Sequence, residues 1–393
     1  MINYKKIIEC LKENEIKFIT GVPDSTLKHI ICAIADDKDF QHVPATNEGE
    51  AVALAAGYFF ATGKVPMVYM QNDGLFNAAN ALASLCSFNV YDVPMLLMIG
   101  KRGIEGDEPQ HLMAGEMLED FLKLLHIPCN YQHIENNENI EDEILEDLSS
   151  AIIYARREIR PAAIIFQKGS IYDLEEKNKI GTTEPSMREK CLDILLNYIG
   201  IGIVVSTTGL TSRELYELRK KRGEKTDDIL MVGSMGCASA IGLGVALQEN
   251  NDYQHDKSSY RNVYVLDGDG AALMMLGNMA TIGYYLPENL VHIIFDNGGY
   301  VSTGKQQRIG DRINWQMLAQ GLGYYTFKEV DGRSMAETKC FGKLGEILDF
   351  HKMPMPALIV IKIDQSVRGD LGRPKDLKEI RKNFMIKIFN KDI

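Results

Sequence analysis

The sequence predicts an α/β protein of two domains, each a mostly parallel sheet flanked by helices. Short apolar, β-branched runs alternate with stretches of helical periodicity, which is typical of β-α-β units and parallel sheets. This alternation occurs on both sides of a polar stretch with little periodicity. A chain of 393 residues is long enough for two substantial cores. We therefore predict a first domain at 1–168, a linker at 169–188 and a second domain at 189–393, with no domain between them.

In the first domain, strands are expected where apolar runs end in turn residues, and helices where apolar residues recur at helical spacing. The expected strands are 16–20, a run ending in 41–50, 65–71, 95–100, 127–132 and 162–167, and the expected helices are 3–14, 26–35, 51–62, 77–87 and 139–157. Residues 101–115 are polar, glycine-rich and without periodicity, so we expect an active-site loop there.

The same criteria divide the second domain. The expected strands are 202–206, 227–232, 262–266, 290–295 and 357–363, and the expected helices are 186–198, 212–221, 238–249, 271–284, a helix near 315–322 and a basic helix at 375–389. Residues 250–261 are expected to form a polar surface loop.

Charge and cysteine content exclude several classes of protein. The net charge is −11 and basic residues form only short pairs, which disfavours nucleic-acid binding. The seven cysteines contain no C-x-x-C pair, so neither a disulfide framework nor a zinc site is indicated, and reduced thiols in the cytoplasm are expected. No apolar run approaches the roughly 18 to 20 residues that span a bilayer, and the N-terminus lacks the apolar core of a signal peptide.

Residues 262–299 form the most informative segment. Two apolar runs flank a helical stretch, and a right-handed crossover places their strands side by side and parallel. Asp269 and Asn297 then emerge at the same carboxyl edge of the sheet, where open α/β sheets bind ligands. A carboxylate and an amide oxygen beside a helix N-terminus suit a hard cation and a phosphate group. The alternative is a pair of ordinary strand-ending turns.

This pattern, Gly268-Asp269-Gly270 followed by Asn297 after the next strand, resembles the signature of thiamine diphosphate enzymes. The resemblance implies that Asp269, Asn297 and the backbone carbonyl of Gly299 hold Mg²⁺, which binds the diphosphate of the cofactor. It also implies two thiamine diphosphate-binding domains, the first for the pyrimidine and the second for the diphosphate. The remaining cofactor-binding residues that it implies are Gly268, Gly270, Thr208, Gly209, Gly233, Met235 and Asn72.

Four of these residues have a specific expected role. Thr208 and Gly209 are expected to donate to phosphate oxygens. The backbone carbonyl of Gly233 is expected to accept from the pyrimidine amino group, while Met235 supports the bent cofactor. The alternative for the last two is a helix N-terminal loop with a core methionine.

Glu48 is the expected catalytic carboxylate of the first domain. Glu48 lies at the end of the second strand, and burial beside the pyrimidine would raise the pKa of its carboxylate. The alternative is a first-turn glutamate favoured by the helix dipole, an interpretation that also applies to Glu50. Because the resemblance places Glu48 and the metal on different domains, it implies active sites between subunits and at least a homodimer.

Further motifs are similar to those of the phosphonopyruvate decarboxylases, with the sulfopyruvate decarboxylases as relatives. These motifs are residues 21–25, 47–57, 69–72, 107–111, 207–215 and 371–374. The implied reaction converts phosphonopyruvate to phosphonoacetaldehyde and CO₂, with Asp24 and His111 handling protons. The alternatives are a helix cap for Asp24 and a surface loop for His111.

The chain departs from that family at three positions. Asp73 and Phe76 stand where the family usually has serine and glycine, and Lys305 stands where it has glycine. Asp73 would repel an anionic phosphonate if it faced the pocket. A cationic clamp of Lys101, Arg102, His111 and Lys305 is expected to neutralise the phosphonate.

Three other functions remain open at this point. The first is a sulfopyruvate or other 2-keto acid decarboxylase, or a carboligase of the same family. The second is a catalytically silent scaffold of the same fold, disfavoured because both Glu48 and the metal pair are present. A nicotinamide dehydrogenase is disfavoured because no G-x-G-x-x-G follows a first strand.

Overall fold

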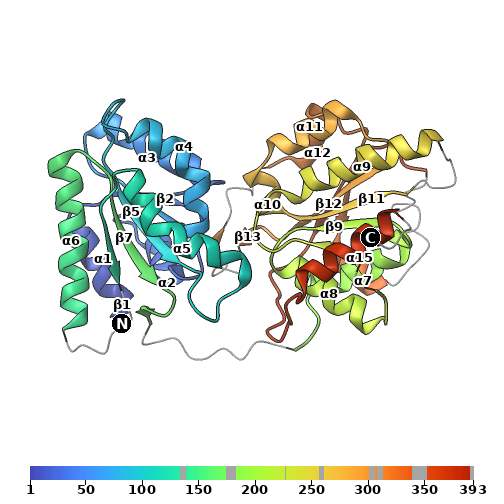
Figure 1. Ribbon diagram of the computed structural model, residues 1–393, viewed down its shortest axis with the longest axis horizontal. Coiled ribbons are helices and arrows are strands. Elements are labelled where there is room, and N and C mark those ends of the chain that lie inside the picture. Colours follow the sequence, from blue (N-terminus) through green and yellow to red (C-terminus); the bar gives the residue numbers. More distant parts are fainter. Residues whose placement is uncertain are drawn as a thin grey trace. The chain divides into compact units, whose positions relative to one another are not determined.

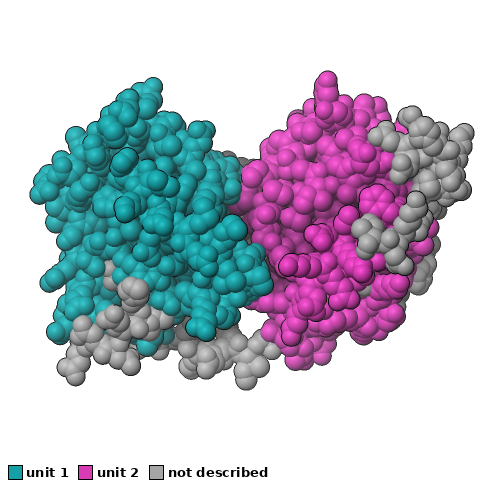
Figure 2. Space-filling view, viewed as in Figure 1, with its two compact units in different colours: residues 1–179, 300–309 teal, residues 180–299, 310–393 magenta. Residues whose placement is uncertain are grey.

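The computed structural model divides the chain into two compact units (Figures 1 and 2). Unit 1 comprises Met1–Lys179 and Tyr300–Ile309, and unit 2 comprises Ile180–Gly299 and Gly310–Ile393. The structure describes residues 1–132, 139–173, 183–225, 227–255, 261–300, 306–307, 313–338 and 352–389. The division between residues 179 and 180 lies within 169–188, and the predicted domain bounds stay a prediction.

The described part of unit 1 contains a six-stranded, wholly parallel sheet in the order β3-β2-β4-β5-β7-β6. Its strands are β2 (Phe18–Gly21), β3 (Gln41–Pro44), β4 (Met67–Gln71), β5 (Leu96–Lys101), β6 (Cys129–Gln132) and β7 (Ala162–Gln167). Its helices are α1 (Tyr4–Glu13), α2 (Lys28–Asp36), α3 (Glu48–Thr62), the 3₁₀ turn η1 (Asn72–Gly74), α4 (Leu75–Leu85), α5 (Pro109–Leu124) and α6 (Ile140–Glu158).

Two apolar cores lie on opposite faces of this sheet. Successive strand residues point to opposite faces, so Met67 and Tyr69 join one core and Val68 and Met70 join the other. Helices α1, α2 and α6 supply the first core, and α3, α4 and α5 supply the second. The short strand β1 (Ile2–Asn3) pairs in parallel with β8 (Ile171–Tyr172), which lies within the predicted linker.

Unit 2 repeats this architecture, with a parallel six-stranded sheet among its described residues in the order β10-β9-β11-β12-β16-β15. Its strands are β9 (Ile203–Ser206), β10 (Ile229–Leu230), β11 (Val263–Gly268), β12 (Leu290–Asp296), β15 (Thr326–Asp331) and β16 (Ala357–Lys362). Its helices are α7 (Met187–Ile199), α8 (Leu210–Lys221), α9 (Ala238–His255), α10 (Asp269–Met274), α11 (Gly277–Tyr285), α12 (Trp315–Gly321), α13 (Gly332–Thr338) and α15 (Leu377–Phe389).

Helices cover both faces of the second sheet (Figure 1). One core takes residues from α7, α8 and α13, and the other takes residues from α9, α10, α11 and α12. The two-residue strands β13 (Gly299–Tyr300) and β14 (Gln306–Gln307) form a separate small sheet. The predicted fold class, with two parallel sheets flanked by helices, is confirmed.

The central β-α-β segment is also confirmed, since β11 and β12 are adjacent and parallel with Gly268 opposite Phe295. The helix expected at 271–284 begins earlier, at Asp269, and is divided into α10 and α11. Asp269 is therefore the first helical residue after the strand.

Two predicted loops are wrong in part. Residues 101–115 contain the start of α5 at Pro109, because proline is well suited to the first turn of a helix and its missing N–H costs nothing there. Residues 250–261 contain the end of α9, which continues to His255.

The edge strand β15 and helix α13 have no counterpart in the prediction. β15 lies at one end of the sheet and exposes Lys328 and Glu329, so it lacks a continuous apolar run. Among the residues that the structure describes, no helix is both long and apolar enough to cross a lipid bilayer.

Candidate active site

Glu48 lies at the start of α3 and is almost completely buried, with 5% of its surface exposed. Its Oε2 accepts a hydrogen bond from Asn77 Nδ2 at 2.9 Å. Burial raises the pKa of Glu48 above its ordinary value, and the negative charge of Asp73 raises it further. The expected direction of this pKa is confirmed, whereas the catalytic role of Glu48 stays a prediction.

The structure shows that Glu48 and its neighbour Glu50 have different hydrogen-bond partners. Glu50 Oε2 accepts from the backbone N–H of Thr46 at 2.8 Å and from its hydroxyl at 2.5 Å. The Asn47 side chain in turn accepts from the N–H of Glu50 at 2.9 Å, as an N-cap does. Glu50 is thus the glutamate that stabilises the helix terminus, and Glu48 remains available for other chemistry.

A glycine allows the close packing of Glu48. A Cβ placed on Gly74 would lie 2.3 Å from Glu48 Oε1, too near for any side chain. The backbone of η1 therefore lies directly against the carboxylate.

Asp24 follows β2 and is also buried, with 2% of its surface exposed. Its Oδ2 accepts from the backbone N–H groups of Thr26 at 3.0 Å and Leu27 at 3.2 Å, just before α2 begins. Within the described residues its Oδ1 has no hydrogen-bond partner. Burial raises the pKa of Asp24 to about 6. Asp24 therefore does satisfy backbone donors ahead of a helix, and it also keeps one buried oxygen for a ligand or a proton.

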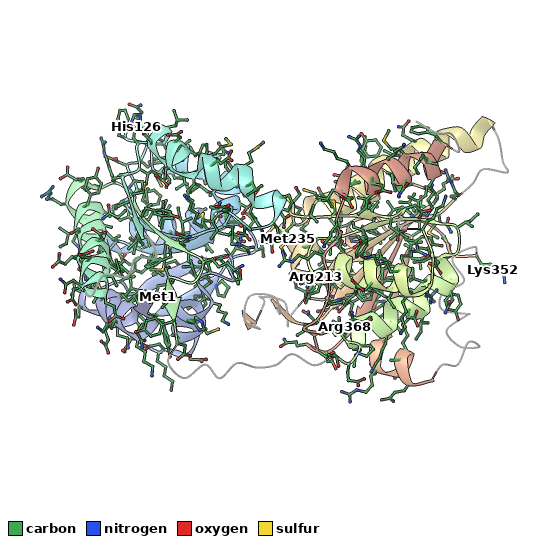
Figure 3. All side chains as sticks on the ribbon, turned by 60° about the horizontal axis from the view of Figure 1, so that its bottom comes forward. Met1, His126, Arg213, Met235, Lys352 and Arg368 are labelled. Atoms are coloured by element: carbon green, nitrogen blue, oxygen red, sulfur yellow. The ribbon has the colours of Figure 1, made fainter. Side chains whose placement is uncertain are left out.

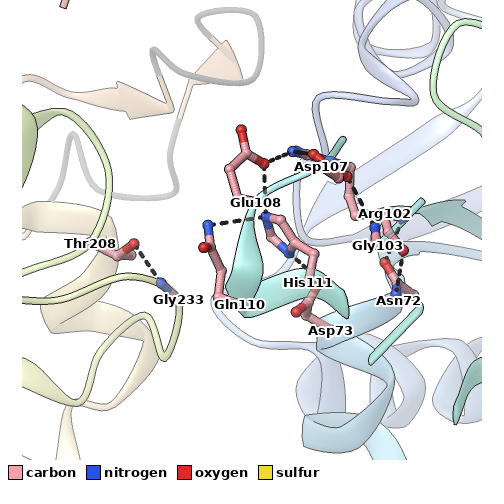
Figure 4. Close-up of polar contacts among 10 residues, drawn as sticks. All are labelled: Asn72, Asp73, Arg102, Gly103, Asp107, Glu108, Gln110, His111, Thr208 and Gly233. Carbon is pink, nitrogen blue, oxygen red and sulfur yellow. Dashed lines mark hydrogen bonds and ion pairs between the residues drawn. The ribbon is translucent and has the colours of Figure 1, made fainter. Parts of the chain in front are cut away.

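His111 lies in the first turn of α5, where its side chain is only 12% exposed. Its Nδ1 is 2.9 Å from Asp73 Oδ2 (Figure 4). Its Nε2 is 3.6 Å from Glu108 Oε2 and 3.5 Å from Gln110 Nε2. The expected alternative, a surface loop histidine, is wrong for its position, because His111 is helical and mostly buried.

Arg102 is part of the same network. It makes hydrogen bonds to Asp107 through Nε at 2.7 Å and Nη2 at 2.5 Å, and it also donates to Glu108. This pairing lowers the pKa of Asp107 to about 2. The side chain of Asn72, fully buried, exchanges two hydrogen bonds with the backbone of Arg102, at 2.9 and 3.2 Å. Asn72 thus ties the end of β4 to the end of β5, and its cofactor contact stays a prediction.

The described cationic residues of the expected phosphonate clamp already contact acidic side chains of this chain. Lys101 Nζ lies 3.2 Å from Glu119 Oε1 and 4.3 Å from the centre of the Tyr131 ring. Arg102 and His111 have the acidic partners given above, and Lys305 lies outside the described residues. Each described cation of the clamp therefore already has a carboxylate neighbour, which sequence reasoning missed.

In unit 2 the structure brings the predicted metal residues together. Asp269 Oδ2 accepts from the backbone N–H of Gly298 at 3.1 Å, and its Oδ1 accepts from Gly270 at 2.9 Å. Asn297 Oδ1 accepts from the N–H of Gly299 at 3.0 Å. Gly298 has a φ of 70°, a left-handed conformation that favours glycine. A carboxylate, an amide oxygen and a backbone carbonyl are oxygen ligands that fit Mg²⁺, so this donor set suits the implied metal.

Asp296 supports this loop and was not anticipated. Its Oδ1 accepts from the N–H of Gly298 at 3.2 Å, while its Oδ2 accepts from Trp315 Nε1 at 2.9 Å and Lys362 Nζ at 2.5 Å. Strands β12 and β16 and helix α12 are thereby joined beside Asn297. The available signal in the sequence was an aspartate at the end of an apolar run, directly before Asn297.

The other predicted cofactor loops of unit 2 also have defined geometry. The N–H of Gly233 donates to Thr208 Oγ1 at 2.9 Å, so the loops after β9 and β10 meet (Figure 4). Gly209 has a φ of 90° at the start of α8, and a Cβ added to Gly209 or Gly268 would meet no atom within 4 Å. These open backbones leave room for a phosphate. Met235 is half-buried rather than part of a core.

Two of the motifs noted in the sequence contact each other through Arg213, which is labelled in Figure 3. Its Nε donates to the carbonyl of Gly372 at 3.0 Å, and its Nη2 donates to the carbonyl of Leu371. Arg213 thus fastens residues 371–374 to α8.

Known proteins match most of the chain. The thiamine pyrophosphate enzyme N-terminal TPP binding domain matches residues 4–124, and the corresponding C-terminal TPP binding domain matches 207–337. The phosphonopyruvate decarboxylase of Streptomyces hygroscopicus is 33% identical over 402 residues, covering 95% of this chain and 91% of that protein. The phosphonopyruvate decarboxylase of Streptomyces viridochromogenes is 30% identical, with coverages of 95% and 92%. The sulfopyruvate decarboxylase of Methanosarcina acetivorans is 28% identical over 84% of each chain.

Proposed function

Because the chain belongs to the thiamine pyrophosphate enzymes and is a thiamine diphosphate-dependent decarboxylase, we propose that it uses Mg²⁺ to convert phosphonopyruvate to phosphonoacetaldehyde and CO₂. The similarity to phosphonopyruvate decarboxylases along nearly the whole chain carries this proposal. When bound, thiamine diphosphate supplies a sink for the electrons of the bond that CO₂ leaves.

In this proposal unit 2 binds the diphosphate end of the cofactor. Asp269, Asn297 and the carbonyl of Gly299 hold Mg²⁺, supported by the contact between Asp269 and Gly298. Thr208 and Gly209 face the phosphates, with Gly268 and Gly270 on either side of the metal aspartate. The carbonyl of Gly233 and the side chain of Met235 orient the remainder of the cofactor.

Unit 1 handles protons. Glu48, whose pKa is raised by burial, holds a proton at the pyrimidine ring. Asp24 and His111 move protons to and from the substrate carbon. A carboxyl with a pKa of about 6 can both give and take a proton near neutral pH, which supports this role for Asp24.

We further propose that the enzyme acts in the cytoplasm as at least a homodimer with active sites between subunits. The six cysteines in the described part of the chain are all free thiols, which agrees with a reducing compartment. The two proposed halves of the site, Glu48 and Asp269, lie in different units.

A second substrate, sulfopyruvate, is favoured by one specific observation. In the described residues, Lys101, Arg102 and His111 each have a carboxylate neighbour, so little positive charge is left for a dianion. A sulfonate carries a single negative charge with similar tetrahedral oxygens. The two substrates therefore need to be compared directly.

The test is release of CO₂ by purified protein from phosphonopyruvate, sulfopyruvate and pyruvate, each with and without an aldehyde acceptor. We expect phosphonopyruvate to be turned over fastest and Lys305→Ala to lower that rate by roughly tenfold to a hundredfold, as loss of a charged hydrogen bond does. Chelation with EDTA should abolish activity and Mg²⁺ should restore it. Equal rates with pyruvate would refute the phosphonate assignment, and no turnover of any keto acid would point to a silent scaffold.

A further inference from the structure

Asp73 occupies the position where the chain departs from the serine of the enzymes that it resembles. It lies in η1, directly after β4, and its side chain is one-third exposed. The Asp73 carboxylate has a close neighbour, because its Oδ2 lies 2.9 Å from Nδ1 of His111 in the first turn of α5. The Asp73 carboxylate, which was expected to repel an anionic substrate if it faced the pocket, is thus directed at an imidazole (Figure 4).

The other nitrogen of His111 has different neighbours. Nε2 lies 3.6 Å from Glu108 Oε2 and 3.5 Å from Gln110 Nε2, both beyond a good hydrogen bond. Glu108 is itself paired with Arg102, which also binds Asp107. Of the described groups around this imidazole, Asp73 therefore makes the one short contact.

A carboxylate can only accept, so the imidazole nitrogen facing it must carry the proton. Neutral histidine has a single N–H, and the hydrogen bond made by one nitrogen decides the state of the other. With Nδ1–H directed at Asp73, Nε2 keeps its lone pair and is the atom able to take a proton. An imidazolium formed there would gain a charged hydrogen bond to Asp73.

We propose that Asp73 is a positioning residue, which holds His111 in its Nδ1–H tautomer with Nε2 as the proton-exchanging atom. This inference rests on the proposed function for the role of His111 in catalysis. Asp73 also links two candidate proton carriers, because its charge acts on Glu48 as well as contacting His111. In this chain the serine-to-aspartate exchange thereby alters proton handling rather than substrate charge alone.

The test reads the tautomer directly, without any substrate. The protein is labelled with ¹⁵N at histidine, and two-bond ¹⁵N–¹H correlation spectra are recorded where the signals are those of neutral imidazole. His111→Gln identifies the His111 signals among those of the eight histidines. We expect a protonated Nδ1 and an unprotonated Nε2 in the wild type. An Nε2–H tautomer in the wild type would overturn the proposal.

The variant Asp73→Ser restores the residue usual in the family and removes the carboxylate. It should shift His111 toward the Nε2–H tautomer and lower kcat by roughly tenfold to a hundredfold, with a smaller change in KM. Asp120→Asn, an exposed aspartate in α5, is the matched control and should change neither the tautomer nor kcat. An unchanged tautomer in Asp73→Ser would refute the inference. Because the spectra need no turnover, they stand even if the proposed substrate is wrong.

Discussion

At the scale of single residues, unit 1 contains two carboxylic acids that are buried from solvent. Asp24 and Glu48 are each about 95% buried or more, and burial raises the pKa of both. Folding around an ionised, partly unsatisfied carboxylate is costly, and proteins retain such groups chiefly at functional sites. We therefore regard these two side chains as groups kept for chemistry at the expense of stability.

This cost predicts a specific pH dependence for Asp24→Asn. The pKa of Asp24 is about 6 in the folded protein against 3.8 ordinarily, so the folded state retains the proton longer. The contribution of Asp24 to stability is therefore fully present below pH 3.8 and is lost as pH rises to about 6. A difference of about two pH units corresponds to about 3 kcal/mol. Relative to the wild type, the variant should gain about this much in free energy of unfolding between pH 4 and 7.

Thermal unfolding followed by circular dichroism across that pH range measures the difference. Asp36→Asn, an exposed aspartate in α2, serves as control and should track the wild type at every pH. A variant whose advantage over the wild type does not grow with pH would show that Asp24 is not a buried, raised-pKa carboxyl.

The sequence allowed some of these residues to be recognised but not their partners. The resemblance to thiamine diphosphate enzymes, together with the position of Glu48 at the end of the second strand, predicted its burial and its raised pKa. The contact of Asp73 with His111 was not predictable, because 101–115 was expected to be a loop and the start of α5 at Pro109 was missed. Side-chain pairs between distant segments depend on the backbone path of both, and neither periodicity nor composition specifies that path.

At the scale of elements, the position of the Glu48 carboxylate depends on how closely η1 approaches α3. Gly74 ends η1 with a φ of −69°, so alanine could adopt its backbone conformation without strain. The obstacle is steric, because the added Cβ would lie 2.3 Å from Glu48 Oε1 and 2.6 Å from its Cδ. The glutamate side chain is the flexible partner and would be displaced from Asn77.

We therefore predict that Gly74→Ala impairs activity far more than stability. Since Glu48 moves rather than the backbone, the free energy of unfolding should fall by about 1 kcal/mol. A catalytic group displaced by about 1 Å costs about a hundredfold in rate. Gly57→Ala in α3, where a Cβ meets no atom within 4 Å, should retain activity and gain up to about 1 kcal/mol. The measurements are the decarboxylation rate and the free energy of unfolding from chemical denaturation, for both variants. Full activity in Gly74→Ala would contradict this packing argument.

At the scale of the whole molecule, the architecture could be predicted from the hydrophobic pattern of the sequence, because both sheets are parallel and buried on both faces. Such strands are continuous apolar runs, which are readily recognised in a sequence. The exception is β15, an edge strand whose exposed residues are polar. The pairing of units in an active site cannot be predicted in this way. It depends on how subunits associate, and local sequence pattern does not specify that association.

The last prediction addresses that assembly. We propose that Glu48 of one subunit and Asp269 of another serve the same active site, so two inactive variants can complement each other. Glu48→Gln should bind thiamine diphosphate but not turn over substrate, because the proton carrier is lost. Asp269→Ala should fold but lose the cofactor, because Mg²⁺ loses a carboxylate ligand.

In a two-fold dimer of one variant with the other, one site combines both substitutions and the second site has neither. Random pairing yields about half mixed dimers, each with one intact site, so co-expression should restore about a quarter of wild-type activity. Differently tagged subunits allow the mixed dimer to be purified, and its activity should be about half that of the wild type. If each site lay within a single subunit, mixed dimers would be as inactive as their parents, since every site would carry one of the two substitutions. Activity of the mixed dimer therefore distinguishes a site shared between subunits from a site contained in one.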